Sequence, residues 1–493
     1  MCAKRTPCAG TAPVIVWLRS DLRLADNPAL SAAAQSGAPV IPVYILDDAA
    51  GGKWMRGGAS RWWLHQSLGK LDASLQKKKF HPLVYLKGAA GDELDKLIAD
   101  TGAQAVYWNR CYEPWSIARD KGIKESLKSR SIDAQSFSAY LMFEPWSIQN
   151  KTGGSYKVFT PFSKACLDLS GTIRPAMDAP KPDVPHSGDV LAAGIGLDAL
   201  GLMPKIKWYG GMQSTWTPGE AGAMKRFADF LEDGVGEYKA QRDFPAIDGV
   251  SMMSPFLHFG EISPHQIWHA VSHAILARGD RDKNFGGHAQ GFLRQLLWRE
   301  FSYHLLYHSP DFPEQPWNKN FTHFPWLQND EYLQKWQKGM TGFPIIDAGM
   351  RQLWQTGWMH NRVRMIVGSF LVKNLLIDWR AGEDWFWDTL VDADLGNNAA
   401  GWQWIAGCGA DAAPYFRIFN PLLQSKKFDP EGDYIRTYVP ELKDMPAAYI
   451  HTPWDAPPML RAQAKNYPPP IVDLNQSRDR ALEAYAVSKS NRS

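Results

Sequence analysis

The sequence of 493 residues has few cysteines and no long apolar run. Its five cysteines are scattered, at positions 2, 8, 111, 166 and 408, and no two form a CxxC pair. We therefore expect reduced thiols in a cytoplasmic protein, with neither a disulfide framework nor an iron–sulfur cluster. No apolar stretch approaches the length of a membrane span, and the start MCAKRTPCAG lacks the apolar core of a signal peptide. These absences argue against a secreted disulfide scaffold and against a membrane protein.

A strong charge of either sign is also missing. The formal net charge of +3 is too small to indicate a nucleic-acid partner by itself, because local clusters of charge matter more than the sum. No GxGxxG motif follows the first predicted strand, so a Rossmann dinucleotide site is not supported, and no metal-ligand cluster stands out. Aromatic residues are abundant instead, with 22 Trp, 22 Phe and 17 Tyr. Most are expected in the core, but such a chain can also hold a large flat ligand or move electrons.

The chain length predicts two or three domains. Residues 1–135 alternate short apolar runs with amphipathic segments. Strands are predicted at 14–18, 40–46, 82–86 and 105–108, and helices near 28–36, 60–78, 92–101 and 116–129. This alternation predicts an α/β domain with a doubly wound parallel sheet.

The texture changes after this first domain. Residues 136–215 are rich in Pro, Gly and Ser and predict a long surface connector. A helix then opens with Thr217 as the N-cap, Pro218 at the first helical position and Glu220 closing a capping box. Helical periodicity recurs at 263–278, 288–308, 346–377 and 383–390. Residues 216–493 are therefore predicted to form an all-α domain.

The predicted helix 288–308 carries a polar and aromatic stripe beside its apolar face. Gln295, Trp298, Arg299 and Ser302 follow one another at helical spacing. An indole between an amide and a guanidinium suits a nucleic-acid base: the indole stacks on the base, while the polar groups bind the edge of the base and a phosphate. Packing of Trp298 between helices and a salt bridge of Arg299 remain an equal alternative.

Another helix, within 346–377, places Asn361, Arg364 and Met365 on one face. Buried Asn and Arg side chains need partners, and Asp392 and Asp394 are the obvious acids. A structural ion pair is the alternative interpretation.

The segment DADLGNNAAGWQW, residues 392–404, also presents an amide and an indole, because Asn398 and Trp402 share a face when this segment is helical. Together with the two acids and an arginine they suit a heterocycle with ribityl or ribose hydroxyls better than hydrolysis. No nucleophile–base pair accompanies them.

Five stretches together resemble the photolyase/cryptochrome family. They are VWLRSDLRLADNPAL (16–30), WREF (298–301), GWMHNRVRM (357–365), DADLGNNAAGWQW (392–404) and DAAPYFRIFNP (411–421). The resemblance is greatest to bacterial cyclobutane-dimer photolyases, of class I or of the plant-cryptochrome-related class III. It implies a lyase that repairs UV-damaged DNA with light, through electron transfer from reduced FAD to a flipped-out pyrimidine dimer. The alternatives are a cryptochrome-type blue-light photoreceptor and a (6-4) photolyase.

The same resemblance implies an FAD in the helical domain. Tyr238 and the turn 251–254 would lie around the phosphates and ribityl chain, where backbone N–H groups attract anions. Val250 stands where members often carry Thr, which removes one hydroxyl contact. Asn398 would face the flavin N5; plant cryptochromes carry Asp there, so this Asn favours a repair enzyme. The implied FAD-binding residues are Tyr238, Ser251, Met252, Met253, Ser254, Asn361, Arg364, Asp392, Asp394 and Asn398.

Three tryptophans match the electron-transfer chain of the family. Trp402, Trp379 and Trp326 would connect the flavin with the surface, since indole is among the easiest side chains to oxidise. With Asn398 they make up the implied catalytic residues.

The implied lesion pocket consists of Trp298, Met365 and Trp404. Enzymes for the (6-4) lesion place His at position 365, so Met365 favours the cyclobutane lesion. Gln295 is a departure, because cyclobutane-dimer enzymes usually carry Glu there whereas (6-4) enzymes and animal cryptochromes carry Gln. The arginines implied to grip DNA or line the pocket are Arg242, Arg299, Arg362 and Arg417.

An antenna chromophore is implied between the domains. Methenyltetrahydrofolate is expected, with 8-hydroxy-deazaflavin as the alternative. Asn109 and Glu113 would contact its pterin, and Trp62 and Trp63 could stack on it. We further expect a monomer with no obligate protein partner, no metal and no membrane association.

Overall fold

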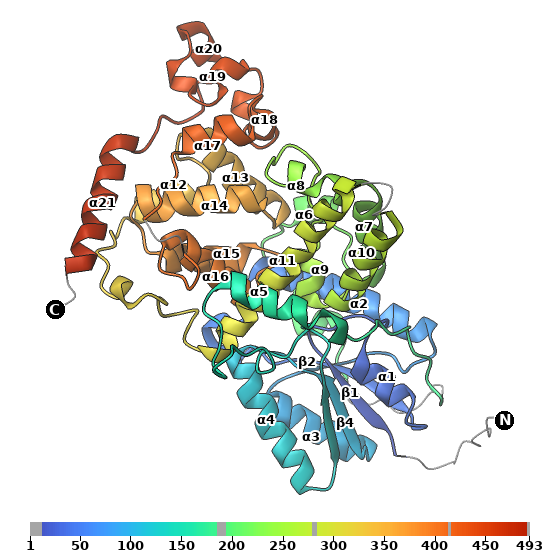
Figure 1. The fold of residues 1–493 in the computed structure, drawn as a ribbon. Helices are drawn as coiled ribbons and strands as arrows, with labels where there is room; N and C mark the ends of the chain where they lie inside the picture. The colour runs from blue at the N-terminus through green and yellow to red at the C-terminus, as the bar shows by residue number, and fades with distance from the viewer. Residues whose placement is uncertain (1–11, 185–193, 279–282, 413–415, 491–493) are drawn as a thin grey trace.

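The structure is a computed structural model, and it describes residues 12–184, 194–278, 283–412 and 416–490 (Figure 1). Its N-terminal part is an α/β unit around a five-stranded sheet in the order β3-β2-β1-β4-β5, with every neighbouring pair parallel. The strands are β1 (Val14–Leu18), β2 (Val40–Leu46), β3 (Val84–Lys87), β4 (Ala105–Asn109) and β5 (Asp133–Phe137). The predicted parallel sheet is confirmed.

Helices cover both faces of this sheet, as a doubly wound fold requires. They are α1 (Pro28–Ala34), α2 (Gly58–Lys77), α3 (Ala90–Thr101) and α4 (Pro114–Ser129). Alternate strand residues separate the two faces: Val16 and Leu18 pack with α1 and α2, whereas Ile15 and Trp17 pack with α3 and α4. The prediction missed β5 because this edge strand, DAQSF, has polar residues and a single buried alanine in place of an apolar run.

The predicted surface connector 136–215 is wrong in part. It contains α5 (Phe159–Asp168) and α6 (Gly210–Thr215), and α5 packs into the core through Phe159 and Phe162. The Phe159 ring stacks on Trp298 with ring centroids 3.5 Å apart. Proline and glycine around these short helices hid their periodicity in the sequence.

Among the described residues after 215, the regular elements are all helices and none is a β-strand, which confirms the all-α prediction. These helices are α7 (Glu220–Asp229), α8 (Tyr238–Gln241), α9 (Ser254–Phe259), α10 (Pro264–Arg278), α11 (Lys283–His308), α12 (Asp330–Gln337), α13 (Pro344–Thr356), α14 (Asn361–Ser369), α15 (Trp379–Thr389), α16 (Leu395–Ala406), α17 (Pro421–Phe428), α18 (Asp433–Tyr438), α19 (Ala447–Ile450), α20 (Pro458–Gln463) and α21 (Leu474–Ser490). Helices α18 to α20 lie at the end farthest from the sheet, at the top of Figure 1.

The start of helix α7 differs from its prediction. Helix α7 begins at Glu220 behind Gly219, so Thr217 does not cap it. The Glu220 carboxylate accepts hydrogen bonds from the backbone N–H groups of Leu24 and Ala25, at 2.9 and 2.8 Å. It therefore ties the helical part to the loop after β1 instead of closing a capping box.

The predicted continuous helix 346–377 is interrupted. Helix α13 ends at Thr356 and is followed by Gly357, whose φ of +66° is in the left-handed region that glycine tolerates. Helix α14 starts anew with His360 as the N-cap, whose ring accepts from the N–H of Arg362, and it continues into a π-helical turn at Phe370–Asn374. This restart places Asn361, Arg364 and Met365 in the first turns of α14.

Candidate functional site

A cavity of about 560 Å³ opens within the helical part, between α8, α9, α11, α14 and α16. Most of the predicted FAD and lesion residues line it. These are Tyr238, Arg242, Ser251, Met252, Met253, Ser254, Gln295, Trp298, Arg299, Asn361, Arg364, Met365, Asp392, Asp394, Asn398, Trp402 and Trp404. A cavity this size, lined mainly by apolar side chains with a few convergent polar groups, has the character of a cofactor site.

The Arg364–Asp392 pair forms one wall. Nη2 of Arg364 donates to both carboxylate oxygens of Asp392, at 3.0 and 2.8 Å, and Nε donates to the carbonyl of Met359 at 2.8 Å. The expected structural ion pair is therefore present, and it faces the cavity. The two opposite charges compensate each other, so the cavity wall carries no unpaired charge at this place.

Asp394 has different partners from those expected. As the N-cap of α16 it accepts at Oδ1 from the backbone and side-chain N–H groups of Asn397, at 2.9 and 2.7 Å. Its Oδ2 accepts from the hydroxyls of Tyr303 and Tyr140, at 2.6 and 2.9 Å. The prediction that Asn361 or Arg364 satisfies this acid is wrong.

Burial alone would raise the pKa of Asp394. The neighbouring His258, the Arg299 guanidinium and the Tyr303 hydroxyl instead hold that pKa well below its usual range. Asp394 is therefore a fixed anion at the cavity wall.

Asn398 is oriented by the neighbouring helix. Its Nδ2 donates to the backbone carbonyl of Glu383 on α15 at 3.1 Å. One N–H of Asn398 is thereby engaged, and the amide oxygen stays available to accept a hydrogen bond from a ligand in the cavity.

The turn 251–254 closes another side of the cavity. Met252 has a φ of +52°, and Trp358 donates through Nε1 to the hydroxyl of Ser254 at 3.4 Å. Arg226 braces the turn from outside, donating to the carbonyls of Ser251 and Val250 at 3.1 and 2.9 Å. The sequence interpretation did not include Arg226, because its partners are backbone atoms that no side-chain pattern reveals.

Arg299 is buried and lines the cavity, in keeping with the pocket-lining alternative for this arginine. Its Nη1 donates to the carbonyl of Tyr140 at 2.8 Å, and its guanidinium lies 4.1 Å from the centroid of the Tyr140 ring. The buried Nη2 has no hydrogen-bond partner among the described residues. A donor of this kind in a cavity wall fits a polar ligand group.

The expected lesion residues Gln295, Trp298, Met365 and Trp404 are half-buried members of the lining, and we call this side of the cavity the mouth. The indole of Trp298 stacks with one face on the Phe159 ring of α5. For that face the alternative interpretation, packing of Trp298 between helices, is correct. Gln295 donates through Nε2 to the carbonyl of Gly291 at 3.1 Å. Met365 and Trp404 stand beside them in the lining.

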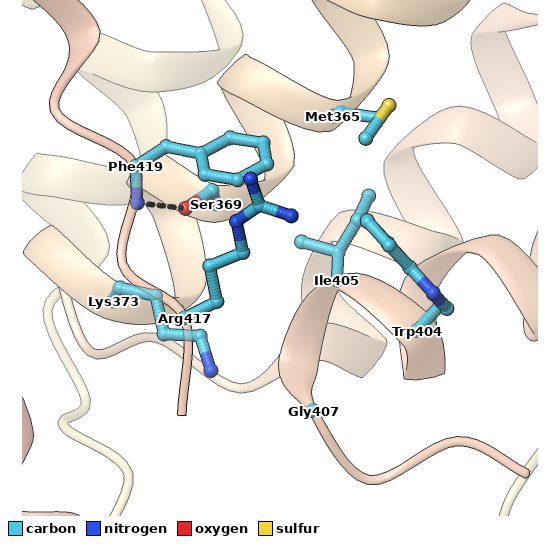
Figure 2. Close-up of a pocket in the computed structure, with 8 residues that line it drawn as sticks. All are labelled: Met365, Ser369, Lys373, Trp404, Ile405, Gly407, Arg417 and Phe419. Atoms are coloured by element: carbon cyan, nitrogen blue, oxygen red, sulfur yellow. Dashed lines mark hydrogen bonds between the residues drawn. The ribbon is translucent and has the colours of Figure 1, made fainter. Parts of the chain in front are cut away.

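The other arginines lie near this mouth. Arg362 pairs with Asp243 at 2.9 Å and covers the Phe428 ring, and Arg242 lies over the Tyr238 ring at 5.1 Å. Figure 2 shows Arg417 extending toward Met365 in a smaller pocket, beside Phe419. This pocket shares Met365, Trp404 and Ile405 with the main cavity.

The three expected relay tryptophans lead away from the cavity. Trp402 on α16 and Trp379 at the start of α15 are buried in one apolar cluster, and Trp326 is half-buried on its edge. Gly382 on α15 lies against the Trp402 ring, where a Cβ would clash. The loop of Trp326 is joined to the segment before Trp379 by the bond from Leu327 N–H to the Leu376 carbonyl, 2.7 Å long. Trp336, which was not predicted, has its ring centroid 6.2 Å from that of Trp402.

The expected antenna contacts are mostly wrong. Trp62 and Trp63 are 1% and 0% exposed, and Trp63 is packed between Trp216, Phe256 and Phe259, so neither indole offers a free face. The NH2 group of Asn109 donates hydrogen bonds to the side chains of Asp21 and Asn27, at 2.6 and 2.7 Å. Glu113 is half-buried at the start of α4 and remains a prediction.

An aromatic stack that was not predicted lies elsewhere. Trp354, 44% exposed, stacks on Trp208 at 4.6 Å and is parallel to Trp385 at 6.0 Å. The three indoles come from distant segments, so no sequence spacing indicated them.

Among the described residues no group of His, Cys, Asp and Glu side chains could hold a metal ion. The same residues form no helix long and apolar enough to cross a bilayer.

Comparison with known proteins gives matches over almost the whole chain. Residues 14–183 match the DNA photolyase family, and residues 292–487 match the FAD binding domain of DNA photolyase. The deoxyribodipyrimidine photo-lyase of Agrobacterium fabrum is 48% identical, over 97% of this chain and 98% of the relative. Cryptochrome-2 of Arabidopsis thaliana is 40% identical, over 97% and 79% respectively. The fold superposes on a bacterial class III photolyase from Agrobacterium tumefaciens with a TM-score of 0.91 and 48% identity, covering 98% of each chain.

Proposed function

The chain belongs to the photolyase/cryptochrome family, and we propose that within it the chain is a light-driven DNA-repair lyase that splits cyclobutane pyrimidine dimers. One observation carries the proposal: the predicted cofactor residues and the predicted lesion residues line a single cavity. Asp392, Asp394 and Asn398 stand on the same walls as Trp298, Met365 and Trp404, so a base extruded into the mouth would meet the cofactor directly.

The cavity fits an FAD on three grounds. It is large, its buried Arg299 Nη2 lacks a partner among the described residues, and the amide oxygen of Asn398 is left as an acceptor. Tyr238, the turn 251–254, Asn361 and the Arg364–Asp392 pair would hold it. When bound and reduced, this cofactor supplies the photoexcited electron that splits the dimer and then takes it back. The protein positions the two partners and excludes water from between them.

The lesion assignment depends on two positions. Met365 has no proton to donate, which favours a cyclobutane dimer over a (6-4) lesion. Asn398 favours a repair enzyme over a photoreceptor, for which plant cryptochromes carry Asp. The arginines near the mouth, Arg242, Arg362 and Arg417, would bind the phosphates on either side of the extruded bases.

A second, light-harvesting chromophore completes the proposal. We expect methenyltetrahydrofolate, with 8-hydroxy-deazaflavin as the alternative that the absorption spectrum of the purified protein distinguishes. Trp62 and Trp63 are too buried to stack on this chromophore. The stack of Trp354 with Trp208 and Trp385, of which Trp354 is 44% exposed, is the alternative aromatic surface for it. We also propose a cytoplasmic monomer with UV-damaged DNA as its partner.

The deciding experiment is repair of a defined thymine-dimer oligonucleotide under blue light, with a dark sample as the control. Restored thymines in the light alone are expected. Failure on this substrate, with light-dependent repair of a (6-4) oligonucleotide, would reassign the lesion. Failure on both, with FAD bound, would favour the photoreceptor.

A further inference from the structure

His258 on α9 lies between the Asp394 carboxylate and a side chain of the α/β part. Its Nδ1 is 3.5 Å from Oδ2 of Asp394, and its Nε2 is 3.1 Å from Nη1 of Arg56. A guanidinium can only donate hydrogen bonds, so Nε2 must keep its lone pair toward Arg56. The ring proton is then on Nδ1, the nitrogen that faces Asp394.

Arg56 comes from the segment that precedes α2, outside the helical part. Its guanidinium lies over the Phe259 ring at 5.3 Å, and Nη2 is 3.5 Å from the hydroxyl of Ser20 after β1. Arg61 holds the Arg56 carbonyl through Nε at 2.9 Å. The position of Arg56 relative to His258 is therefore set by the α/β part.

The groups around Asp394 all favour its ionised form. Tyr140, Tyr303 and Asn397 donate to its oxygens, and Arg299 adds a positive charge nearby. The Glu113 carboxylate acts on these two tyrosines, and its charge raises the pKa of both hydroxyls. His258 faces the same carboxylate of Asp394 with its Nδ1, 3.5 Å from Oδ2.

We propose that Arg56 and His258 are positioning residues of the cavity: Arg56 fixes the Nδ1–H tautomer of His258, and this N–H helps to keep Asp394 ionised beside the cofactor. The proposal rests on the proposed function, since it takes FAD to be the ligand of the cavity. A fixed negative charge in the cavity wall opposes the addition of electrons to a ligand in the cavity. The reduced cofactor is thereby a stronger electron donor, and the α/β part contributes to that strength through Arg56.

The first test reads the tautomer directly. In the protein labelled with 15N-histidine, the signal that disappears in His258→Asn belongs to His258. We expect its Nδ1 to be protonated and its Nε2 not, with this pattern kept in Arg56→Lys and lost in Arg56→Met. A protonated Nε2 in the wild type, or an unchanged pattern in Arg56→Met, overturns the proposal. The measurement does not depend on bound FAD, so it stays separate from the proposed function.

The second test measures the reduction potential of the bound flavin against pH. Arg56→Met and His258→Leu should raise the potential and make it more dependent on pH, because Asp394 then takes up a proton more easily. His258→Asn retains an N–H toward Asp394 and should stay close to the wild type. Arg130→Met is the matched control, since it removes a guanidinium that pairs with Asp95 at the surface of the α/β part.

Two outcomes of this second test are distinguished. A wild-type potential and pH dependence in Arg56→Met and His258→Leu, with FAD bound, overturns the positioning role. If the His258→Leu protein does not fold, Arg56→Met decides alone, because the Arg56 side chain is only half-buried and its replacement disturbs the fold less. A wild-type protein that binds no FAD overturns the proposed function instead, and the tautomer test then still decides the part played by Arg56.

Discussion

Two side-chain amides of the cavity have one end tied to the backbone. Asn398 donates to the Glu383 carbonyl and Gln295 donates to the Gly291 carbonyl, so in both cases the amide oxygen is left for a ligand. This matters for Gln295, whose place is usually taken by Glu in cyclobutane-dimer enzymes. A tethered glutamine presents an acceptor as a carboxylate does, and it can accept from the N3–H of a thymine.

Replacing Gln295 tests this acceptor. Gln295→Ala should weaken binding of a thymine-dimer duplex by about 1–3 kcal/mol, because a polar edge of the dimer stays buried without a partner. Affinity for undamaged duplex should hardly change. Gln295→Glu should keep or improve repair, since a carboxylate is the stronger acceptor. Titrations of both duplexes and repair assays measure these effects. Dimer repair that appears only in Gln295→Glu would show that the wild type acts on another lesion.

Replacing Asn398 tests the other acceptor. The Asn398→Ala protein should still bind FAD, because the remaining cavity wall is unchanged, but its reduced flavin should be oxidised faster in air. The decay of the reduced absorption spectrum after mixing with air gives the rate. A reduced flavin that persists as long as in the wild type would remove this role from Asn398.

At the scale of elements, helices α15 and α16 bring the proposed electron relay together. Gly382 lets the two helices approach, because a Cβ at this position would clash with the Trp402 ring. Trp379 begins α15 in the same apolar cluster. The family resemblance implied the three tryptophans, whereas the closeness of the helices came only from the structure. Trp336 at 6.2 Å from Trp402 is a competing neighbour for the same electron.

The relay is tested by paired substitutions. Trp379→Phe should stop light-driven reduction of oxidised FAD, because phenylalanine is far harder to oxidise than indole. Repair by chemically reduced protein should remain. Trp336→Phe is the matched control and should leave the reduction rate near that of the wild type. Loss of the reduction in Trp336→Phe but not in Trp379→Phe would redirect the electron path through α12.

Sequence patterns predicted which segments are helical more accurately than where each helix ends or which side chains bind one another. Residues 346–377 have one apolar period, yet Gly357 and the His360 cap divide them, and that division orients Asn361 and Arg364. The donors of Asp394 could not be predicted, because Tyr140 and Tyr303 come from segments far apart in the chain. Trp62 and Trp63 have the composition of a stacking site, but only their burial shows that they form core instead.

At the scale of the whole molecule, buried polar groups join the α/β part to the helices. The sheet was predictable from its apolar strands, whereas this junction was not, since its members are single polar residues. Glu261 is the clearest case: it is fully buried and accepts from Trp63 Nε1 on α2 at 3.1 Å and from the Gly219 N–H at 2.7 Å. Burial outweighs these bonds and raises the pKa of Glu261 to about 8.

A raised carboxyl pKa makes stability depend on pH in a definite direction. Between its value in the unfolded chain and about 8, the folded protein binds a proton that the unfolded chain has released, so the free energy of unfolding falls as the pH rises. Glu261→Gln removes this titration while keeping the shape of the side chain. From about pH 5 to about pH 8 the wild type should lose up to about 4 kcal/mol more than this variant. Urea unfolding at both pH values measures the difference, with the exposed Glu331→Gln as the control that should follow the wild type. An equal loss in Glu261→Gln would mean that Glu261 is already ionised in the folded protein, and that the junction of the two parts holds a buried charge.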